Sequence, residues 1–335
     1  MREQVQEVLD KLKIAYRDSR EQLFEVEILS CTPESVALGG RVLDDPAREM
    51  LEAALRSAVP SLQADTSAVR VLREDPPQYL TVDTNLTGLY TQPTFHCDLL
   101  SELLYGWPLE VLETQEDWCF VRQMDGYLGW AYRGYLTEDI APSPTHLVVA
   151  PESFLRAEAD PEAKLLTRVL GGTSLKVSRG QGDWAEVRAN KNGWLPLADL
   201  RALSRLPQTA EEKRAMMVED AARMIGVQYL WGGCTAHGID CSGLAQLLYR
   251  WIGVTLPRDA DMQHAVGRPV EPPFLPGDLM FFGEDGKRIT HVGISMGGWN
   301  TIHSSRKRNG VYIDDVQAEQ DYLKKIYIDT RRYLD

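Results

Sequence analysis

The most regular apolar pattern in the chain follows residue 240. Four large apolar residues recur there at helical spacing, which predicts a helix with one buried face. They are Leu244, Leu247, Leu248 and Trp251. Asp240 is the expected N-cap, because an aspartate carboxylate accepts from the free N–H groups of a first helical turn. The helix therefore begins at Cys241, directly after the glycine-rich stretch 229–239.

A series of shorter runs, rich in apolar and β-branched residues, follows this helix and predicts strands. It begins at Pro276 and passes through the segments around His291 and His303. Because Met296-Gly-Gly is a turn signal between these two segments, they are expected to pair as a hairpin. One helix-borne cysteine facing an antiparallel sheet is an α+β arrangement, and we expect residues 208–335 to form it.

The start of this region is marked by a capping box, Thr209-Ala-Glu-Glu212. The helix that it begins is expected to end at Gly226. Its apolar residues are Ala215, Val218, Ala222 and Ile225.

Residues 1–76 predict a small αββαβ module. Residues 2–20 carry a helical stripe of apolar residues, namely Val5, Val8, Leu9, Leu12 and Ile14. Two strands follow, at 23–29 and 35–43, and a second helix begins after the capping Asp44. The element order and a glycine turn at residues 38–42 resemble a BON-like module. No catalytic set lies here, so the expected role is structural or interaction.

Residues 80–140 and 144–205 predict two copies of one unit. Four landmarks recur 64 or 66 residues later. They are Gly106, Trp118, Trp130 and Leu136, which return as Gly172, Trp184, Trp194 and Leu200. Such self-similarity marks duplicated units, and short strands with Gly-Trp and Asp-Trp turns predict small β-barrels with the tryptophans in their cores. Both copies resemble bacterial SH3-like domains.

Cys241 is the candidate nucleophile of the chain. A thiol in a first helical turn is near the positive end of the helix dipole, which favours the reactive thiolate. In papain-like chemistry a histidine activates the cysteine and a third polar group orients that histidine. His291 followed by His303 provides these two groups in the right order. The alternative is a small buried cysteine that only packs at a helix start.

A metal site is the second alternative for this segment, because Cys234, His237 and Cys241 have the spacing C-x2-H-x3-C. Zinc sites usually combine two short spacings, and no second pair of ligands follows here. We therefore expect no metal and no other cofactor.

Six motifs in this order resemble those of the NlpC-type cysteine peptidases of bacterial cell-wall metabolism. They are Tyr229-Leu-Trp-Gly-Gly, Asp240-Cys241-Ser242-Gly243, Leu256-Pro257-Arg258, Gly277-Asp-Leu-Met-Phe-Phe282, His291-Val-Gly-Ile and Ile302-His303. The resemblance implies a papain-like catalytic domain with Cys241 as nucleophile, His291 as base and His303 as orienting residue. It also implies that Tyr229 and the Cys241 N–H stabilise the oxyanion.

The whole domain order resembles one branch of that family, the γ-D-glutamyl-L-diamino-acid endopeptidases. This branch cleaves small murein peptides that have a free N-terminal L-Ala. The resemblance implies substrate contacts from Asp240, Ser242 and Asp259. It also implies that Tyr127, in Gly126-Tyr127-Leu-Gly-Trp130, closes the pocket.

Two positions depart from the pattern of this branch. Ala260 stands where a serine is usual, and Gln92 stands where an acidic residue before the proline is usual. Both departures concern fine specificity.

Composition limits the partners and the compartment. The 335 residues suffice for two to four domains, and a formal net charge of −13 argues against nucleic acid and anionic membrane surfaces as partners. No apolar run approaches a membrane span. Charges occupy the N-terminus where a signal peptide needs its apolar core, and five sparse cysteines fit a reducing compartment. These features predict a cytoplasmic protein.

Three other functions remain open at this point. One is an exported peptidoglycan endopeptidase that uses the SH3-like units as wall anchors. Another is a non-catalytic peptide-binding or interaction protein, and the third is an acyltransferase on the same papain-like scaffold.

Overall fold

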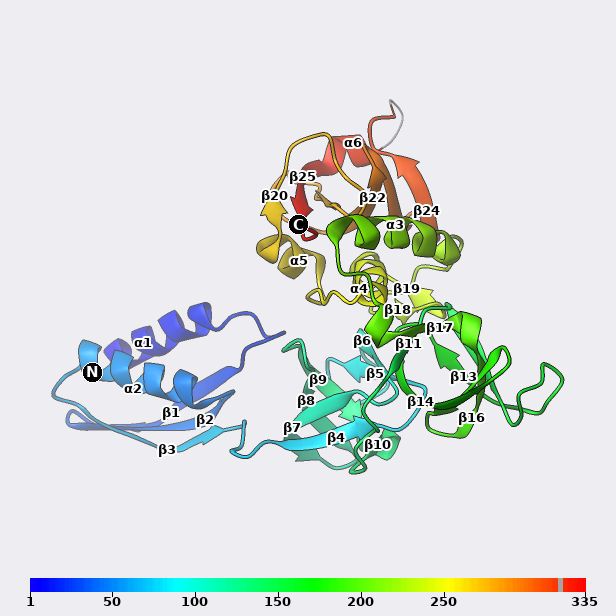
Figure 1. The fold of residues 1–335 in the computed structure, drawn as a ribbon. Coiled ribbons are helices and arrows are strands. Elements are labelled where there is room, and N and C mark those ends of the chain that lie inside the picture. Colours follow the sequence, from blue (N-terminus) through cyan, green and yellow to red (C-terminus); the bar gives the residue numbers. More distant parts are fainter. Residues whose placement is uncertain (319–321) are drawn as a thin grey trace. The chain divides into compact units, whose positions relative to one another are not determined.

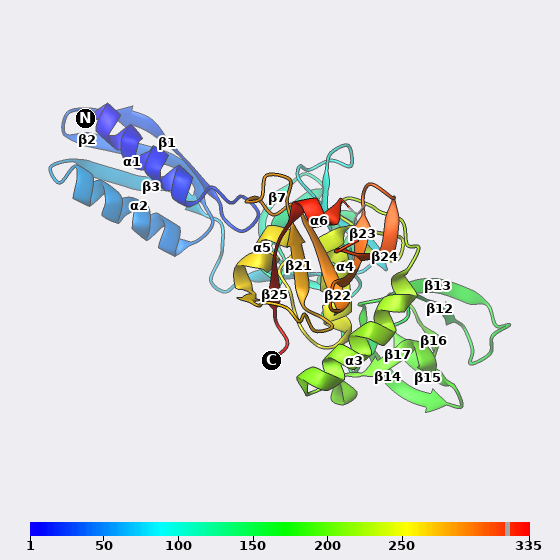
Figure 2. The ribbon, with the colours of Figure 1, turned by 90° about the horizontal axis from the view of Figure 1, so that it is seen from above.

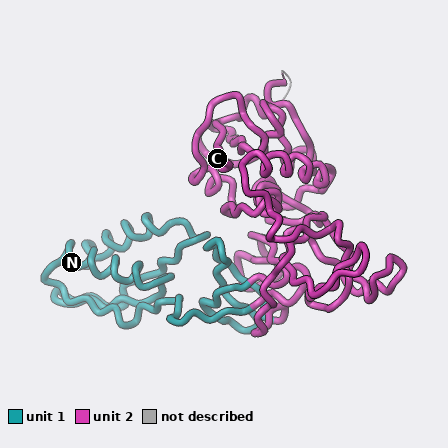
Figure 3. Tube along the Cα trace, in the orientation of Figure 1, with its two compact units in different colours: residues 1–80, 108–133 teal, residues 81–107, 134–335 magenta. Residues whose placement is uncertain are grey.

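The computed structural model describes residues 1–318 and 322–335. The chain divides into two compact units (Figure 3). Unit 1 comprises residues 1–80 and 108–133, and unit 2 comprises residues 81–107 and 134–335. Within the described residues, no helix is long and apolar enough to cross a membrane.

Unit 1 begins with a three-stranded sheet that carries two helices on one face (Figures 1 and 2). Its elements are α1 (Arg2–Ala15), β1 (Phe24–Cys31), β2 (Ser35–Val42), α2 (Asp45–Ala58) and β3 (Gln63–Val71). The central strand β2 is antiparallel to β1 and parallel to β3. This is the αββαβ order expected from the sequence. The likeness to a BON module stays a prediction.

Two details of this module differ from the sequence pattern. The glycines expected in a turn, Gly39 and Gly40, lie inside β2 instead. A Cβ on Gly40, which has φ +120°, would lie 1.9 Å from the carbonyl oxygen of Glu25, so the close strand pairing requires glycine there. In α1 the first four apolar residues of the stripe are buried, whereas Ile14 is exposed.

The same unit contains an antiparallel meander of β7 (Pro108–Gln115), β8 (Trp118–Arg122) and β9 (Leu128–Tyr132). Ion pairs join the N-terminal module to β7, with Arg70 at 2.6 Å from Glu113 and Arg73 at 2.7 Å from Glu110. Arg41 also pairs with Glu113. Leucines cluster beside these pairs: Leu23, Leu43, Leu72, Leu112 and Leu128. The N-terminal module is therefore packed against this meander.

Unit 2 contains the strands β4 (Gln78–Val82, whose first part belongs to unit 1), β5 (Leu86–Tyr90), β6 (Leu99–Leu104) and β10 (Leu136–Thr137). The end of β4 pairs with β10, and β5 pairs with β6. The second SH3-like copy forms one sheet in the order β13-β12-β16-β15-β14-β11-β17. Its strands are β11 (His146–Val148), β12 (Glu152–Arg156), β13 (Leu165–Leu170), β14 (Ser174–Gln181), β15 (Trp184–Arg188), β16 (Asn192–Pro196) and β17 (Leu200–Ala202).

The C-terminal part of unit 2 packs helices against a six-stranded antiparallel sheet with the order β20-β25-β21-β22-β23-β24. The strands are β20 (Arg268–Pro269), β21 (Leu279–Phe282), β22 (His291–Gly297), β23 (Asn300–Ser305), β24 (Gly310–Asp315) and β25 (Tyr327–Arg332). The helices are α3 (Ala210–Ala221), α4 (Cys241–Trp251), α5 (Ala260–Val266) and α6 (Leu323–Ile326). A short hairpin of β18 (Cys234–Thr235) and β19 (Gly238–Ile239) leads into α4.

Helix α4 is the central element of this core. Its four predicted apolar residues are all buried, and they share one cluster with Val292, Ile294 and Ile302 of the sheet. The expected helix after the expected cap is confirmed: Asp240 is the N-cap of α4.

The buried face of α3 differs from the apolar residues that mark this helix in the sequence. Ala215, Ala222 and Ile225 are exposed, whereas Met217 and Asp220 are buried. Asp220 is buried because Arg201 of β17 pairs with it, at 2.9 Å and 3.2 Å. The buried face of α3 is therefore the one that carries Asp220, and not the one predicted from the apolar residues Ala215, Ala222 and Ile225.

Contacts from the second barrel reach the end of α4. Arg201 Nη1 donates to the carbonyl oxygen of Trp251 over 2.7 Å. A Cβ built on Gly171 would lie 2.6 Å from the carbonyl oxygen of Ala150 and 2.8 Å from the Trp251 ring. The barrel and the helix are thus packed too closely for any side chain at residue 171.

Candidate active site

The start of α4 is held by the Asp240 carboxylate. Oδ1 accepts from the Gly243 N–H over 2.7 Å, and Oδ2 accepts from the Gly232 N–H over 3.0 Å. The first bond caps the helix and the second ties the glycine-rich loop to it. Together they fix the backbone on both sides of Cys241.

Arg258 completes this arrangement, and the sequence analysis did not select it as a site residue. Its guanidinium lies 2.6 Å and 3.1 Å from the two Asp240 oxygens, and Nη1 donates to Ser242 Oγ over 2.9 Å. Arg258 is 1% exposed. Its place in Leu256-Pro257-Arg258, soon after the helix, is the only signal that the sequence offers. Gln263, also buried, donates to the Ser242 carbonyl over 3.1 Å.

The Cys241 thiol is not the preformed thiolate that its place in the first turn suggested. Burial and the neighbouring Asp240 carboxylate raise the pKa of Cys241 to about 12. Hydrogen bonds from the Val292 and Ser242 N–H groups to the sulfur act in the opposite direction, as does the more distant Arg258. Desolvation outweighs the helix dipole here, because a charged sulfur loses more from burial than it gains from partial charges. The resting group is the neutral thiol.

His291 and His303 lie on the paired strands β22 and β23, as the sequence predicted. His291 Nε2 is 2.8 Å from His303 Nδ1, so one imidazole orients the other. Gly293 lies beside His303, and a Cβ there would come within 3.2 Å of the His303 Cβ and 2.4 Å of Thr301 Oγ1. A side chain at residue 293 would therefore displace Thr301 and the start of the His303 side chain.

The position of His291 relative to the thiol follows from its neighbour. Cys241 packs against the core cluster that contains Val292, the residue after His291, so the start of β22 lies beside the start of α4. Since Nε2 of His291 is engaged by His303, Nδ1 is the nitrogen available to the thiol. Burial, followed by the neighbouring His303, holds the pKa of His291 well below its ordinary value. A neutral imidazole is thus the resting base.

His303 is fully buried and has a second partner that the sequence analysis missed. Its Nε2 is 2.9 Å from Oδ2 of Asp314 on β24. The other carboxylate oxygen accepts from Arg308. The hydrogen bond from His303, together with Arg308, lowers the pKa of Asp314, so this group is a carboxylate at neutral pH. An aspartate eleven residues after the histidine gives no recognisable signal without knowledge of the register.

Tyr229 lies next to the nucleophile segment. It forms an isolated parallel bridge with Ile239, and the Leu230 N–H donates to the Ile239 carbonyl over 3.3 Å. Burial raises the pKa of Tyr229, and the adjacent Cys241 and Asp240 add to that effect. Its hydroxyl therefore remains a neutral donor, which is the form that an oxyanion requires.

Glu102 of β6 reaches the loop before the nucleophile, and the sequence gave no reason to choose it. Its carboxylate accepts from the Cys234 N–H over 2.7 Å and also interacts with Thr235. Burial raises the pKa of Glu102. The first SH3-like region thus supports the hairpin that leads to Asp240.

The other two predicted substrate contacts are Asp259 and Tyr127. Asp259 is the N-cap residue of α5 and is partly exposed, one residue after Arg258. Tyr127 is buried in the β8–β9 turn of unit 1, whereas Cys241 belongs to unit 2. The role of Tyr127 stays a prediction.

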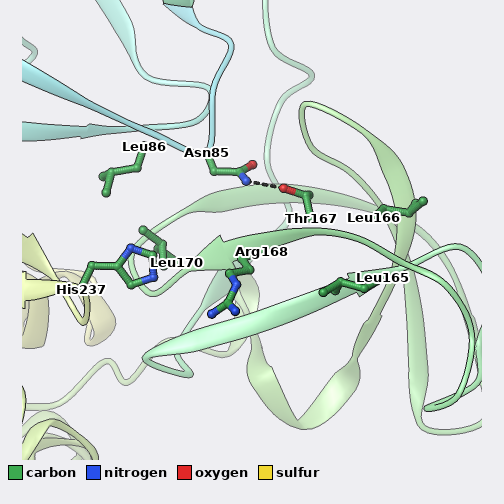
Figure 4. A pocket seen from close by; sticks show the side chains of 8 residues that line it. All are labelled: Asn85, Leu86, Leu165, Leu166, Thr167, Arg168, Leu170 and His237. Atoms are coloured by element: carbon green, nitrogen blue, oxygen red, sulfur yellow. Dashed lines mark hydrogen bonds between the residues drawn. The ribbon is translucent and has the colours of Figure 1, made fainter.

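His237, a ligand in the alternative hypothesis of a metal site, is hydrogen-bonded to a residue of the second barrel. Its Nε2 lies 2.9 Å from Glu152 Oε1, and Arg168 binds the same carboxylate. Among residues 1–318 and 322–335, no three His, Cys, Asp or Glu side chains are placed to hold a metal ion. His237 and Arg168 instead line a pocket of about 350 Å³, together with Asn85, Thr167 and four leucines (Figure 4). None of the proposed catalytic residues lines this pocket.

Comparisons with known proteins identify two of the domains. Residues 226–332 match the sequence profile of the NlpC/P60 family, and residues 89–139 match that of the bacterial dipeptidyl-peptidase Sh3 domain. Dipeptidyl-peptidase 6 of Lysinibacillus sphaericus is 28% identical over 261 residues, which are 72% of this chain and 92% of the relative. The γ-D-glutamyl-L-lysine dipeptidyl-peptidase of Bacillus cereus is 28% identical over 256 residues, 70% of this chain and 75% of the relative.

A solved structure of an NlpC/P60 family protein has a similar fold. The crystal structure of an NlpC/P60 family protein from Bacillus cereus superposes with a TM-score of 0.66 at 25% identity. The match covers 77% of this chain and 100% of that one.

The fold and the matched domains define a papain-like cysteine peptidase, and hence a hydrolase. More narrowly, the chain combines an NlpC/P60 catalytic domain with a bacterial dipeptidyl-peptidase SH3 domain. Two of its relatives are named γ-D-glutamyl-L-lysine dipeptidyl-peptidases, and another, from Escherichia coli, is named a murein DD-endopeptidase.

Proposed function

We propose that this protein hydrolyses the bond between γ-D-Glu and the diamino acid in free murein peptides, such as L-Ala-γ-D-Glu-diaminopimelate or its lysine counterpart. L-Ala-D-Glu is the released product. The observation that carries the proposal is the extent of the match, which spans 92% of a relative named dipeptidyl-peptidase 6. Two other relatives, a γ-DL-glutamyl hydrolase and a bifunctional muramidase/DL-endopeptidase, align over only 32% and 46% of their length.

The neutral Cys241–His291 pair supports a mechanism in which proton transfer accompanies attack. The thiol proton passes to His291 Nδ1 as the sulfur bonds to the γ-glutamyl carbonyl carbon. Tyr229 and the Cys241 N–H donate to the resulting oxyanion. When the C–N bond breaks, His291 returns the proton to the leaving amine. Water, deprotonated by His291, then hydrolyses the thioester and restores the thiol.

A free N-terminal L-Ala is the specificity that we propose for the substrate. An α-ammonium is favoured by a nearby carboxylate, and Asp240 is the carboxylate beside the nucleophile. Its two oxygens already accept from two backbone N–H groups, from Ser242 and twice from Arg258. Asp240 would therefore act on the ammonium with help from Asp259. The role of Tyr127 against longer N-terminal extensions is proposed from the sequence resemblance alone.

We propose that the protein acts in the cytoplasm, where it would recycle cell-wall peptides. The acidic composition and the sparse, odd set of five cysteines support that placement. No cofactor enters the proposed reaction, because the thiol, the imidazole and water balance every step.

The test is mass spectrometry of the products from L-Ala-γ-D-Glu-meso-diaminopimelate and L-Ala-γ-D-Glu-L-Lys, each run beside its N-acetylated form. Cleavage of the free peptides alone is the expected result. Equal cleavage of both forms, or release of peptides from whole sacculi, would favour an exported wall hydrolase instead. Cys241→Ala is the control, and it must abolish cleavage.

A further inference from the structure

We propose that Asp314 sets the tautomers of both active-site histidines and thereby keeps the lone pair of His291 Nδ1 available to the Cys241 thiol. Asp314 does not touch the reacting atoms, so it is a positioning residue. The inference rests on the proposed cysteine peptidase chemistry. It adds that Asp314 orients His303, which in turn orients the base His291.

The argument begins at the carboxylate. Asp314 Oδ2 lies 2.9 Å from His303 Nε2, and an ionised carboxylate can only accept a hydrogen bond. His303 Nε2 must therefore carry the proton. In the neutral form of His303 this is the single proton of the ring, so His303 Nδ1 is left as an acceptor.

The same reasoning then passes to His291. His303 Nδ1, now an acceptor, lies 2.8 Å from His291 Nε2, which must donate to it. His291 is the neutral base, so its Nδ1 has no proton and presents its lone pair. Reversal of the first hydrogen bond would reverse the second and would place a proton on His291 Nδ1, facing the thiol. Asp314 thus selects the active arrangement from two that fit the same heavy atoms.

Arg308 makes this selection testable. It donates to Asp314 Oδ1, and its guanidinium lies 3.8 Å from the centre of the Tyr312 ring, which holds it in place. In Asp314→Asn the amide must turn its oxygen to Arg308, because a guanidinium offers only donors. The amide NH2 then faces His303 Nε2, which forces the inactive tautomers. In a double variant with Arg308→Met the amide is free to rotate back.

We therefore expect Asp314→Asn to lower kcat roughly a hundredfold or more with little change in KM, by analogy with the loss that follows the wrong tautomer in a serine protease triad. Asp314→Ala, in which water can replace the acceptor, should lose roughly tenfold. The Asp314→Asn/Arg308→Met double variant should recover at least roughly tenfold over Asp314→Asn. Asp315→Asn is the matched control: its exposed carboxylate accepts only from the Gln317 N–H among the bonds of the described residues.

Two readouts do not depend on the peptide substrate. Nitrogen-15 NMR of the imidazoles should show the proton on Nε2 of both histidines in the native protein. The rate at which iodoacetamide alkylates Cys241, followed by peptide mapping, should fall in Asp314→Asn and recover in the double variant. If the peptides are not cleaved but these two results hold, only the proposed substrate is wrong.

The opposite results would overturn the inference. A proton on His303 Nδ1 in the native protein would do so, and so would an Asp314→Asn variant at least as active as Asp314→Ala. Should Asp314→Asn fail to fold in thermal unfolding, the NMR measurement on the native protein decides alone.

Discussion

Asp240 and Arg258 form a buried ion pair at the start of the catalytic helix, with Arg258 Nη2 2.6 Å from Asp240 Oδ2. Both side chains are almost entirely removed from water. Because Asp240 also caps α4 and holds Gly232, the pair couples the glycine-rich loop, the nucleophile and the start of α5. Asp240 thus has a structural task that is separate from any contact with substrate.

Removal of Arg258 should be costly. Arg258→Met leaves the Asp240 carboxylate buried without its counter-charge, a change that typically costs about 3–5 kcal/mol. We expect urea unfolding to show a loss of this size. The double variant Arg258→Met/Asp240→Asn should lose less than Arg258→Met alone, since it removes both charges. Equal stability of Arg258→Met and the native protein would show that the pair is not buried.

Alkylation of Cys241 should report the neutral resting pair. Its pKa of about 12 means that the thiolate fraction rises about tenfold per pH unit throughout the neutral range. The iodoacetamide rate, measured by peptide mapping, should therefore rise between pH 6 and 10 above the pH-independent part that proton transfer to His291 supplies. A plateau from pH 5 to 8 would instead indicate a preformed thiolate–imidazolium pair.

The acid side of the activity profile should follow His291. The pKa of His291 lies well below 6.5, so the base stays neutral at pH values where an ordinary histidine is already protonated. We expect kcat/KM to decline only well below pH 6.5. A decline centred at pH 6.5 or above would contradict the partly buried, neutral state of His291.

The sequence predicts those parts of the site whose residues stand in a local motif, and it does not predict the others. Leu244 and Trp251 mark a helix because their spacing alone decides which face is buried. Cys241, His291 and His303 stand in motifs whose residue types suggest their chemistry. Asp314 and Glu102 carry no such mark, since their roles come only from strand register and from a neighbouring domain.

Two expectations failed for a shared physical reason. The thiolate at Cys241 was expected from helix geometry, but burial determines its pKa. The apolar residues of α3 predicted which face of the helix is buried, but the buried face is the one on which Asp220 pairs with Arg201. Desolvation and long-range charge pairing both depend on residues far away in the sequence. Local pattern therefore cannot supply them.

Glu102 should link stability to pH in an unusual direction. Burial raises its pKa in the folded state, so its contribution is greatest below the unfolded pKa of about 4.3 and is lost as pH rises through the folded value. Glu102→Gln keeps an acceptor for the Cys234 N–H and removes the ionisation. We expect thermal unfolding of this variant to lose less stability than the native protein between pH 4 and 7. Glu102→Ala, which orphans that N–H, should cost roughly 1–3 kcal/mol at any pH.

Gly171 should test whether the second barrel supports the catalytic helix. The Cβ of Gly171→Ala would lie 2.8 Å from the Trp251 ring and 2.6 Å from the carbonyl oxygen of Ala150 in the same barrel, so both the barrel and its contact with the end of α4 must shift. Overpacking of this kind costs roughly 1–3 kcal/mol. We expect a lower midpoint of urea unfolding and a lower kcat. Gly180→Ala is the matched control in the same barrel, because its Cβ would meet nothing closer than 3.8 Å. If Gly171→Ala destabilises the protein but leaves kcat unchanged, the barrel stabilises the fold without positioning Cys241.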